Sequence, residues 1–221
     1  MKKIIFYILI IVSVLVFSGC SNEKKLPKPE LESGIRGEQF GIDKNINEAT
    51  IDQYLNRSDA VYRDVRLLVD PAKYEEIGGD SYLSGFVKGF EVVSYPYLVN
   101  VTGLPEAVGS TYEGPTLFTQ NSDGTYTANY KESMEILEYL FPKDKVIFIM
   151  CGGGGYAGMT KNLLVALGWD QNKIYNVGGF WFYEGDNAVN TKRTKADGSV
   201  VYDFYKVSYH DIDFSNLTPK N

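Results

Sequence analysis

The sequence is poor in the residues that build most metal and disulfide sites. Its 221 residues include two cysteines, Cys20 and Cys151, and a single histidine, His210. These are too few for a zinc finger, an iron–sulfur centre or a disulfide framework. We therefore expect no metal and no cofactor. A mechanism that needs a histidine base has only His210, which lies close to the C-terminus.

Positive charge is also scarce. The chain has 22 Lys and Arg against 28 Asp and Glu, a formal net charge of −6. A nucleic-acid-binding surface needs clustered basic side chains that neutralise phosphates, so we expect no nucleic acid among the partners. Hydrophobic residues make up 44% of the chain and charged residues 23%. These proportions are typical of a globular protein with a packed core rather than of a disordered chain.

Only the N-terminus carries a long hydrophobic run. The basic residues Lys2 and Lys3 precede the apolar stretch 4–17, and the small residues Ser18 and Gly19 follow it. A basic start, a short apolar stretch and small residues are the pattern of a bacterial secretory signal. The apolar stretch is shorter than the roughly 20 residues of a permanent membrane-spanning helix, so we expect an export signal rather than a transmembrane anchor.

Cys20 directly follows these small residues, an arrangement that resembles the lipobox of bacterial lipoproteins. The resemblance implies that residues 1–19 are removed and that Cys20 is lipidated. The protein would then be held at a membrane on the extracytoplasmic side of a bacterial cell envelope. Simple secretion without lipid is the alternative. Residues 20–44 lack apolar periodicity, so we expect a flexible tether there and a folded domain over 45–221.

The rest of the chain alternates strand and helix patterns. Uninterrupted or β-rich apolar runs predict strands at 90–98, 145–150 and 174–177. Helical spacing of apolar residues predicts helices at 130–140 and 159–167. Strands that alternate with helices are typical of an α/β fold, with a central, mostly parallel sheet flanked by helices.

Two Asp-Gly pairs predict added hairpins. The pair Asp123-Gly124 lies within a turn-rich insertion at about 100–127, and Asp197-Gly198 lies within a C-terminal extension at about 188–206. Asp-Gly between strand-forming residues favours the tight turns that join antiparallel strands. The insertion exceeds what a minimal domain needs, and we expect it to act as a lid or a partner surface.

One segment carries a strong chemical signal. Cys151 follows the predicted strand, and four glycines separate it from Tyr156 and Ala157. The glycines are Gly152, Gly153, Gly154 and Gly155. Such a loop lets peptide N–H groups turn towards one point, and the helix N-terminus behind it adds positive potential. A thiol there should ionise at lower pH and become a nucleophile. Cys151 is the candidate catalytic residue, and residues 152–157 are the candidate substrate-binding loop.

Two other interpretations of the loop are weaker. The pattern Gly153-x-x-x-x-Gly158-Met159-Thr160 lacks the lysine that a phosphate loop requires. The pattern Gly153-x-Gly155-x-x-Gly158 matches a dinucleotide fingerprint, but a glycine run satisfies it easily, and no acidic residue follows at the expected place. Both also need a nucleotide that a secreted protein would rarely meet. A cysteine nucleophile explains the cysteine, the glycines and the compartment together.

With this loop, the chain resembles the rhodanese-like family of sulfurtransferases over residues 45–185. Four motifs occur in the family's order, although each alone is weak. They are Asp64-Val65-Arg66, the turn at 85–89, the six-residue loop at 151–156 with Gly168-Trp169 after its helix, and Gly178-Gly179. Phe86 stands in the turn where the family usually has histidine.

The resemblance implies a sulfurtransferase that forms a persulfide on Cys151 and passes the sulfane sulfur to an acceptor. A small sulfane-sulfur donor or a persulfidated protein would be the partner of a monomer, and Asp64 and Arg66 would be a structural pair. Family loops commonly carry Arg or Lys, whereas this loop has none and Tyr156 stands where Arg is frequent. We therefore expect weak thiosulfate binding. A non-catalytic rhodanese-like binding module and a thiol redox sensor are the alternatives.

Overall fold

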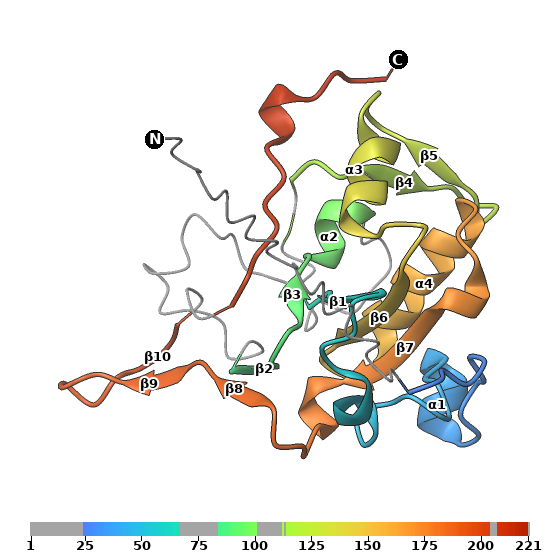
Figure 1. Cartoon of the computed structure of the whole chain (residues 1–221). Helices are drawn as coiled ribbons and strands as arrows, with labels where there is room; N and C mark the ends of the chain where they lie inside the picture. The colour runs from blue at the N-terminus through green and yellow to red at the C-terminus, as the bar shows by residue number, and fades with distance from the viewer. Residues whose placement is uncertain (1–23, 67–83, 101–111, 113, 204–206, 221) are drawn as a thin grey trace, which may run out of the picture.

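Four parallel strands form the central sheet, in the order β3-β1-β6-β7 (Figure 1). The strands are β1 (Ala60–Asp64), β3 (Glu91–Val92), β6 (Val146–Cys151) and β7 (Ile174–Gly179). The computed structural model describes residues 24–66, 84–100, 112, 114–203 and 207–220. The predicted α/β class with a parallel central sheet is confirmed, and β6 and β7 cover the strands expected at 145–150 and 174–177.

Paired strands and short helices surround this sheet. The antiparallel pairs are β2 (Gly85–Val87) with β8 (Ala188–Asn190), β4 (Phe118–Gln120) with β5 (Tyr126–Ala128), and β9 (Lys192–Thr194) with β10 (Val200–Tyr202). The α-helices are α1 (Ile35–Phe40), α2 (Tyr95–Leu98), α3 (Ser133–Leu140) and α4 (Gly155–Ala166). Short 3-10 turns are η1 (Ile51–Tyr54), η5 (Gln171–Lys173), η6 (Phe180–Phe182) and η8 (Phe214–Asn216). Figure 1 shows β8, β9 and β10 extending as an arm from the sheet, with α3, β4 and β5 grouped on the opposite side.

Strand β6 is apolar throughout because both of its faces are buried. Its side chains alternate between two core clusters, as the pleat of a strand requires. Ile147, Ile149 and Cys151 pack on the face covered by α4, whereas Phe148 and Met150 pack on the other face. The thiol therefore points to the side of the sheet on which α4 lies.

Helix α4 begins directly after the loop and earlier than the predicted start at residue 159. Gly154 precedes it with φ of 103° and turns the chain from the strand into the helix. The helix ends as predicted, because Gly168 has a left-handed φ of 97° and Trp169 N–H bonds to the Leu164 carbonyl. The four residues before the predicted helix start, 155–158, are thus helical, and they include the last three residues of the predicted substrate-binding loop.

The strand predicted at 90–98 is replaced by two shorter elements. Only Glu91–Val92 pairs with the sheet as β3, and Tyr95–Leu98 forms the helical turn α2. Pro96 lies at the start of this turn, where its fixed φ suits a helix and its missing N–H costs no hydrogen bond. The β-rich composition of the segment instead reflects burial of large side chains against the core.

Residues 24–44 pack against the domain, which differs from the tether expected for 20–44. Asp43 N–H donates to the Asn176 carbonyl at 2.8 Å, Tyr175 Oη donates to the Pro27 carbonyl at 2.5 Å, and Ile42 is fully buried. The physical reason is that β7 is an edge strand, whose exposed backbone groups this segment covers.

The expected signal at 1–19 and the expected lipidation at Cys20 lie outside the described residues. Within the described ranges, the structure contains no helix that combines the length and apolar character needed to cross a membrane.

Both predicted hairpins are confirmed. Strands β4 and β5 are joined through Asp123-Gly124, and β9 and β10 through Asp197-Gly198. Both turn glycines have a positive φ of 84°, and each aspartate side chain accepts the N–H two residues further on. Much of the insertion at 100–127, namely 101–111 and 113, lies outside the described residues.

Candidate active site

Cys151 is the last residue of β6, at the carboxyl end of an interior strand of the sheet. Ligands of open α/β sheets commonly bind at this end. The cysteine is only 1% exposed and belongs to a core cluster that includes Tyr156 and Ala157. The position agrees with the sequence analysis, but the sulfur is covered rather than open to solvent.

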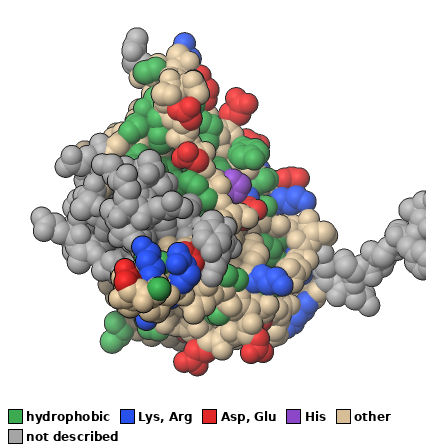
Figure 2. All heavy atoms as spheres, turned by 90° about the vertical axis from the view of Figure 1, so that its left-hand side faces the viewer, with side chains coloured by type: hydrophobic (Ala, Val, Ile, Leu, Met, Phe, Trp, Pro, Cys, Tyr) green, Lys and Arg blue, Asp and Glu red, His purple; other side chains and the backbone are tan. Residues whose placement is uncertain are grey.

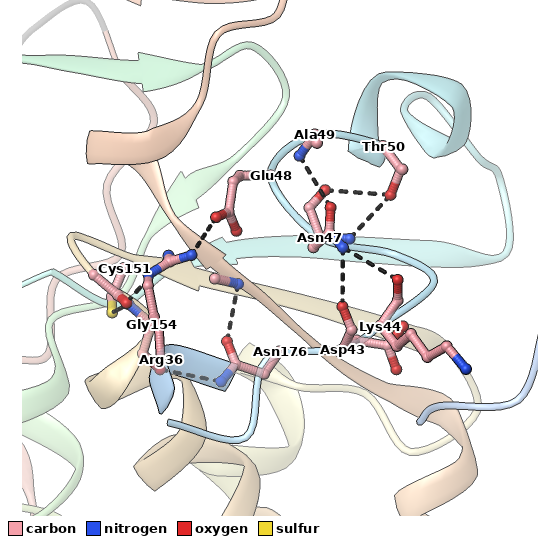
Figure 3. Close-up of polar contacts among 12 residues, drawn as sticks. Arg36, Asp43, Lys44, Asn47, Glu48, Ala49, Thr50, Cys151, Gly154 and Asn176 are labelled. Atoms are coloured by element: carbon pink, nitrogen blue, oxygen red, sulfur yellow. Dashed lines mark hydrogen bonds and ion pairs between the residues drawn. The ribbon is translucent and has the colours of Figure 1, made fainter. Parts of the chain in front are cut away.

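Peptide N–H groups point at the sulfur, as the glycine loop predicted. Gly154 N–H donates to Cys151 Sγ over 3.0 Å (Figure 3). The N–H groups of Gly153 and Ala157 also favour the ionised thiol. Because glycine leaves the space around the backbone open, these amides reach the sulfur without steric obstruction. The loop is therefore a nest of donors around a single acceptor atom.

Three successive carbonyl groups of the loop are held from outside it. The bonds run from Trp181 N–H to Gly152 O at 3.1 Å, from Arg36 Nη2 to Gly153 O at 3.3 Å, and from Asn176 Nδ2 to Gly154 O at 3.0 Å. Figure 3 shows Arg36 and Asn176 beside the loop. These external donors hold the carbonyls on the outside of the loop. In the first two of these peptides the N–H groups are those of Gly153 and Gly154, which act on the sulfur.

The double glycine at the end of β7 allows this close approach. A Cβ at Gly179 would lie 2.1 Å from the Gly152 carbonyl oxygen, so any larger residue would collide with the loop backbone. Gly178 has φ of +96° and lies under Glu48, whose Oε2 would be 1.9 Å from a Cβ there. Only glycine meets both requirements at position 178, a left-handed backbone and no side chain.

The net effect of this environment is to raise the pKa of the Cys151 thiol. Burial contributes most and raises the pKa, whereas the N–H groups of Ala157, Gly154 and Gly153 lower it; the nearby Asp64 charge raises it again. The prediction of a lowered thiol pKa is therefore wrong. The glycine loop was correctly expected to supply donors, but removal of the sulfur from water outweighs them.

Tyr156 lies in the wall around the thiol. It is 8% exposed, and its ring centroid is 5.2 Å from that of Tyr95. Burial, with a smaller contribution from the Cys151 charge, raises the pKa of Tyr156 to about 12, so it remains a neutral phenol at physiological pH. Its ring therefore covers the core on the side of the Cys151 loop.

Asp64 and Arg66 form a buried ion pair at the end of β1. Arg66 Nη2 lies 2.6 Å from Asp64 Oδ2, and Arg66 Nε lies 3.0 Å from both carboxylate oxygens. The guanidinium also donates to the Gly85 carbonyl at 2.6 Å and lies between the rings of Phe86 and Phe180. This geometry agrees with the predicted structural pair, which connects β1 to β2.

Sequence reasoning missed Arg36 and Glu48. They form an ion pair beside the loop (Figure 3), although Arg36 lies in the segment that was expected to be a tether and Glu48 near the start of the expected domain. Arg36 also lies over the Phe182 ring, 3.9 Å from its centroid. The apolar residues Phe40 and Ile42 were the available signal that this segment packs, since Phe40 contacts the start of α4 and Ile42 is buried.

His210 occupies a different part of the sheet. Its Nε2 lies 2.9 Å from Glu91 Oε2, and its N–H bonds to the Val92 carbonyl, so its contacts are with β3. Figure 2 shows the histidine on a face where acidic, basic and apolar side chains are mixed. Among the residues that the structure describes, no group of three or more His, Cys, Asp or Glu is arranged to hold a metal ion.

A scan of the chain against protein-family models finds no match, and a search of the curated proteins finds none either. The geometry and the motifs of this chain are therefore the basis for any statement about its function.

Proposed function

We propose that the protein is a rhodanese-like sulfurtransferase that carries a persulfide on Cys151. The observation that carries the proposal is the bond from Gly154 N–H to Cys151 Sγ, at 3.0 Å, at the carboxyl end of β6. Donors aimed at one sulfur stabilise the anion of the thiol and, after transfer, the anion of the persulfide. This is the electrostatic requirement of a sulfur carrier.

The chemistry consists of two balanced nucleophilic displacements. The Cys151 thiolate attacks the outer sulfur of a donor such as thiosulfate; the new S–S bond forms as the bond to sulfite breaks, and sulfite leaves with the electron pair. The resulting persulfide anion is then attacked at its outer sulfur by a nucleophile such as cyanide. Thiocyanate forms and Cys151 leaves as the thiolate, so the cycle needs no external oxidant or reductant.

Two further features support the proposal. The loop that begins at Cys151 joins a buried strand to a helix, and Gly178-Gly179 end the neighbouring strand, in agreement with the family resemblance. The Asp64–Arg66 pair is closed and buried, which suits the structural role that the resemblance implies. Because Cys151 is 1% exposed, a small donor fits the site better than the bulky surface of a second protein.

Mass spectrometry of the intact protein tests the proposal. The full chain carrying Cys20→Ser, purified in detergent, has Cys151 as its only thiol. We expect incubation with thiosulfate or an organic persulfide to add the mass of one sulfur atom, and cyanide to remove it as thiocyanate. The matched control is Cys151→Ser in the same background. Absence of added sulfur with every donor, or equal addition to the control, would overturn the proposal.

The burial of Cys151 favours a second candidate, a non-catalytic binding module, over the third interpretation of the sequence, a thiol redox sensor. A covered thiol with a raised pKa reacts slowly with both electrophiles and oxidants. This candidate predicts no sulfur addition with any donor. Sensing would also produce a sulfenic acid on Cys151 under peroxide, detected by a dimedone adduct, whereas a pure binding module would give neither product.

We also propose that lipid at Cys20 anchors the protein on the extracytoplasmic side of a bacterial membrane. The support is the sequence pattern of a basic start, an apolar run and Ser18-Gly19 before Cys20. Metabolic labelling with a fatty-acid analogue should mark the wild-type chain and leave Cys20→Ser unlabelled. Labelling of both chains, or of neither, contradicts the proposal.

A further inference from the structure

One peptide unit of the loop is contacted at both of its ends. Gly153 contributes the carbonyl and Gly154 the N–H of the same peptide. The N–H donates to Cys151 Sγ at 3.0 Å, while the carbonyl accepts from Arg36 Nη2 at 3.3 Å (Figure 3). In a planar trans peptide the two groups point in opposite directions. A cation bound to the oxygen therefore withdraws electrons from the nitrogen and strengthens the N–H as a donor.

Arg36 is itself fixed in place. Its guanidinium is paired with Glu48 and lies over Phe182, 3.9 Å from the ring centroid. Glu48 packs in turn over Gly178, where no other residue would leave room for its carboxylate. Arg36 Nε and Glu48 Oε2 are buried and have no hydrogen-bond partner among the residues that the structure describes. The carbonyl of Gly153, the ion pair and the aromatic ring therefore account for the position of the guanidinium.

We propose that Arg36 is a positioning residue for Cys151, which orients and polarises the Gly153–Gly154 peptide from outside the loop and thereby stabilises the thiolate. The loop has no cationic side chain of its own, and Arg36 supplies a cation through the backbone. Glu48 holds Arg36 in place and reduces the strength of its field. The inference rests on the proposed function only in taking the thiolate of Cys151 as the reactive form.

Other charged or titratable groups also face the sulfur. Asp64 from β1, already paired with Arg66, disfavours the thiolate, and Tyr156 from α4 interacts with it as a neutral phenol. The experiment leaves these groups unchanged, so that they act equally in every variant. Only the pair formed by Arg36 and Glu48 is altered.

The test is the pH dependence of Cys151 alkylation by iodoacetamide in the full chain carrying Cys20→Ser. We expect Arg36→Gln to raise the apparent thiol pKa by about half a unit to one unit, which makes alkylation roughly three- to tenfold slower at a fixed pH below the pKa. Arg36→Lys should restore much of the loss, because it keeps the positive charge near the carbonyl.

Glu48→Gln separates the electrostatic role from a structural one. Glutamine keeps the shape and an oxygen that accepts from Arg36, but it removes the negative charge that offsets the guanidinium. We expect the thiol pKa to fall, opposite to the effect of Arg36→Gln. A substitution that only loosened the site would move both variants in the same direction.

Arg57→Gln is the matched control. Arg57 donates to the Lys24 carbonyl and pairs with Asp59, so it anchors the same N-terminal segment at a place other than the loop. We expect no shift in the thiol pKa.

The inference is overturned if folded Arg36→Gln shows no shift, if Glu48→Gln raises the pKa, or if Arg57→Gln shifts it as much as Arg36→Gln. If Arg36→Gln does not fold, Glu48→Gln decides: a lowered pKa supports the inference, and an unchanged or raised one overturns it. Because alkylation needs no sulfur donor, a shift in these variants without any persulfide in the wild type would reject the proposed function alone.

Discussion

At the scale of single residues, burial and hydrogen bonding act on Cys151 in opposite directions, and burial is the stronger effect. The raised pKa of the thiol keeps it protonated at neutral pH, although three peptide N–H groups favour its anion. A depressed pKa would require the same donors with more water around the sulfur. The glycine loop thus reduces a penalty that the fold imposes on the thiolate, and it does not cancel that penalty.

This balance predicts the pH dependence of the reaction. Below its pKa the thiolate fraction rises about tenfold per pH unit. We expect the rate of Cys151 alkylation, and of persulfide formation, to keep rising through neutral pH and to level off only above the ordinary range of a cysteine. Alkylation that is quenched at set times and quantified by mass spectrometry measures this dependence of rate on pH. A plateau reached at or below neutral pH would show that the thiol ionises early and would contradict the prediction.

The buried pair of Asp64 and Arg66 gives a second prediction at this scale. Arg66→Met leaves the Asp64 carboxylate buried without its partner, which typically costs roughly 3–5 kcal/mol of unfolding free energy. Urea denaturation measures the loss. Glu138→Gln is the control, because Glu138 and Lys143 form an exposed pair at 3.8 Å, and such pairs contribute less than about 1 kcal/mol. Equal losses in the two variants would show that the buried pair has no special role.

At the scale of elements, the contact between the end of β7 and the Cys151 loop decides the shape of the site. Gly179→Ala would place a methyl group 2.1 Å from the Gly152 carbonyl oxygen. The loop must move, and we expect a changed thiol pKa together with a loss of stability of about 1–3 kcal/mol from overpacking. Alkylation rate against pH and urea denaturation measure the two effects.

Gly153→Ala is the matched substitution for this prediction. The added methyl group would meet the Trp181 ring only at 3.7 Å, an ordinary contact distance. We expect a much smaller effect on stability than that of Gly179→Ala, although both positions belong to the same contact. If Gly179→Ala were as well tolerated as Gly153→Ala, the close approach of β7 to the loop would not be required for the fold.

Elements with a strong local pattern were predictable from the sequence. The apolar run of β6 and the glycine at the end of α4 require no knowledge of distant residues. The segment 90–98 was not predictable in the same way, because β-rich composition and burial in a core look alike in one dimension. Pro96 is compatible with the end of a strand and with the first turn of a helix, and tertiary packing selected the helix.

The candidate site was likewise predictable from the sequence only in part. The sulfur and the amides around it are consecutive in the sequence, so the motif revealed them. Arg36 lies 117 positions from the carbonyl that it binds, and no local pattern connects the two. The direction of the thiol pKa shift could not be predicted from the sequence either, because it depends on how completely the fold removes the sulfur from water.

At the scale of the whole molecule, the N-terminal segment is part of the domain and part of the site. Residues 24–44 cover the edge of β7, contact the start of α4 and bring Arg36 to the loop. A lipid anchor at Cys20 would therefore attach close to the folded domain rather than at the end of a long flexible linker. Only residues 21–23 separate Cys20 from Lys24, and four extended peptide steps span at most about 14 Å.

Limited proteolysis distinguishes a packed segment from a tether. Trypsin cuts after Lys and Arg where the backbone is accessible and unpaired, so a tether would be cut after Arg36 and Lys44. In the structure Arg36 is inside α1, and the N–H groups of Lys44 and Asn45 are bonded to the Glu30 carbonyl and to Asp43. We expect both sites to be protected in the native protein. Lys195, exposed in the turn between β9 and β10, is the internal control. Its backbone bonds stay within that turn, to Ser199 and Gly198, and we expect it to be cut before Arg36 and Lys44. Intact-mass analysis of a digestion time course identifies the cuts in order. Early cleavage after Arg36 or Lys44 would contradict the packed arrangement and would also remove the physical basis for the role of Arg36 at the thiol.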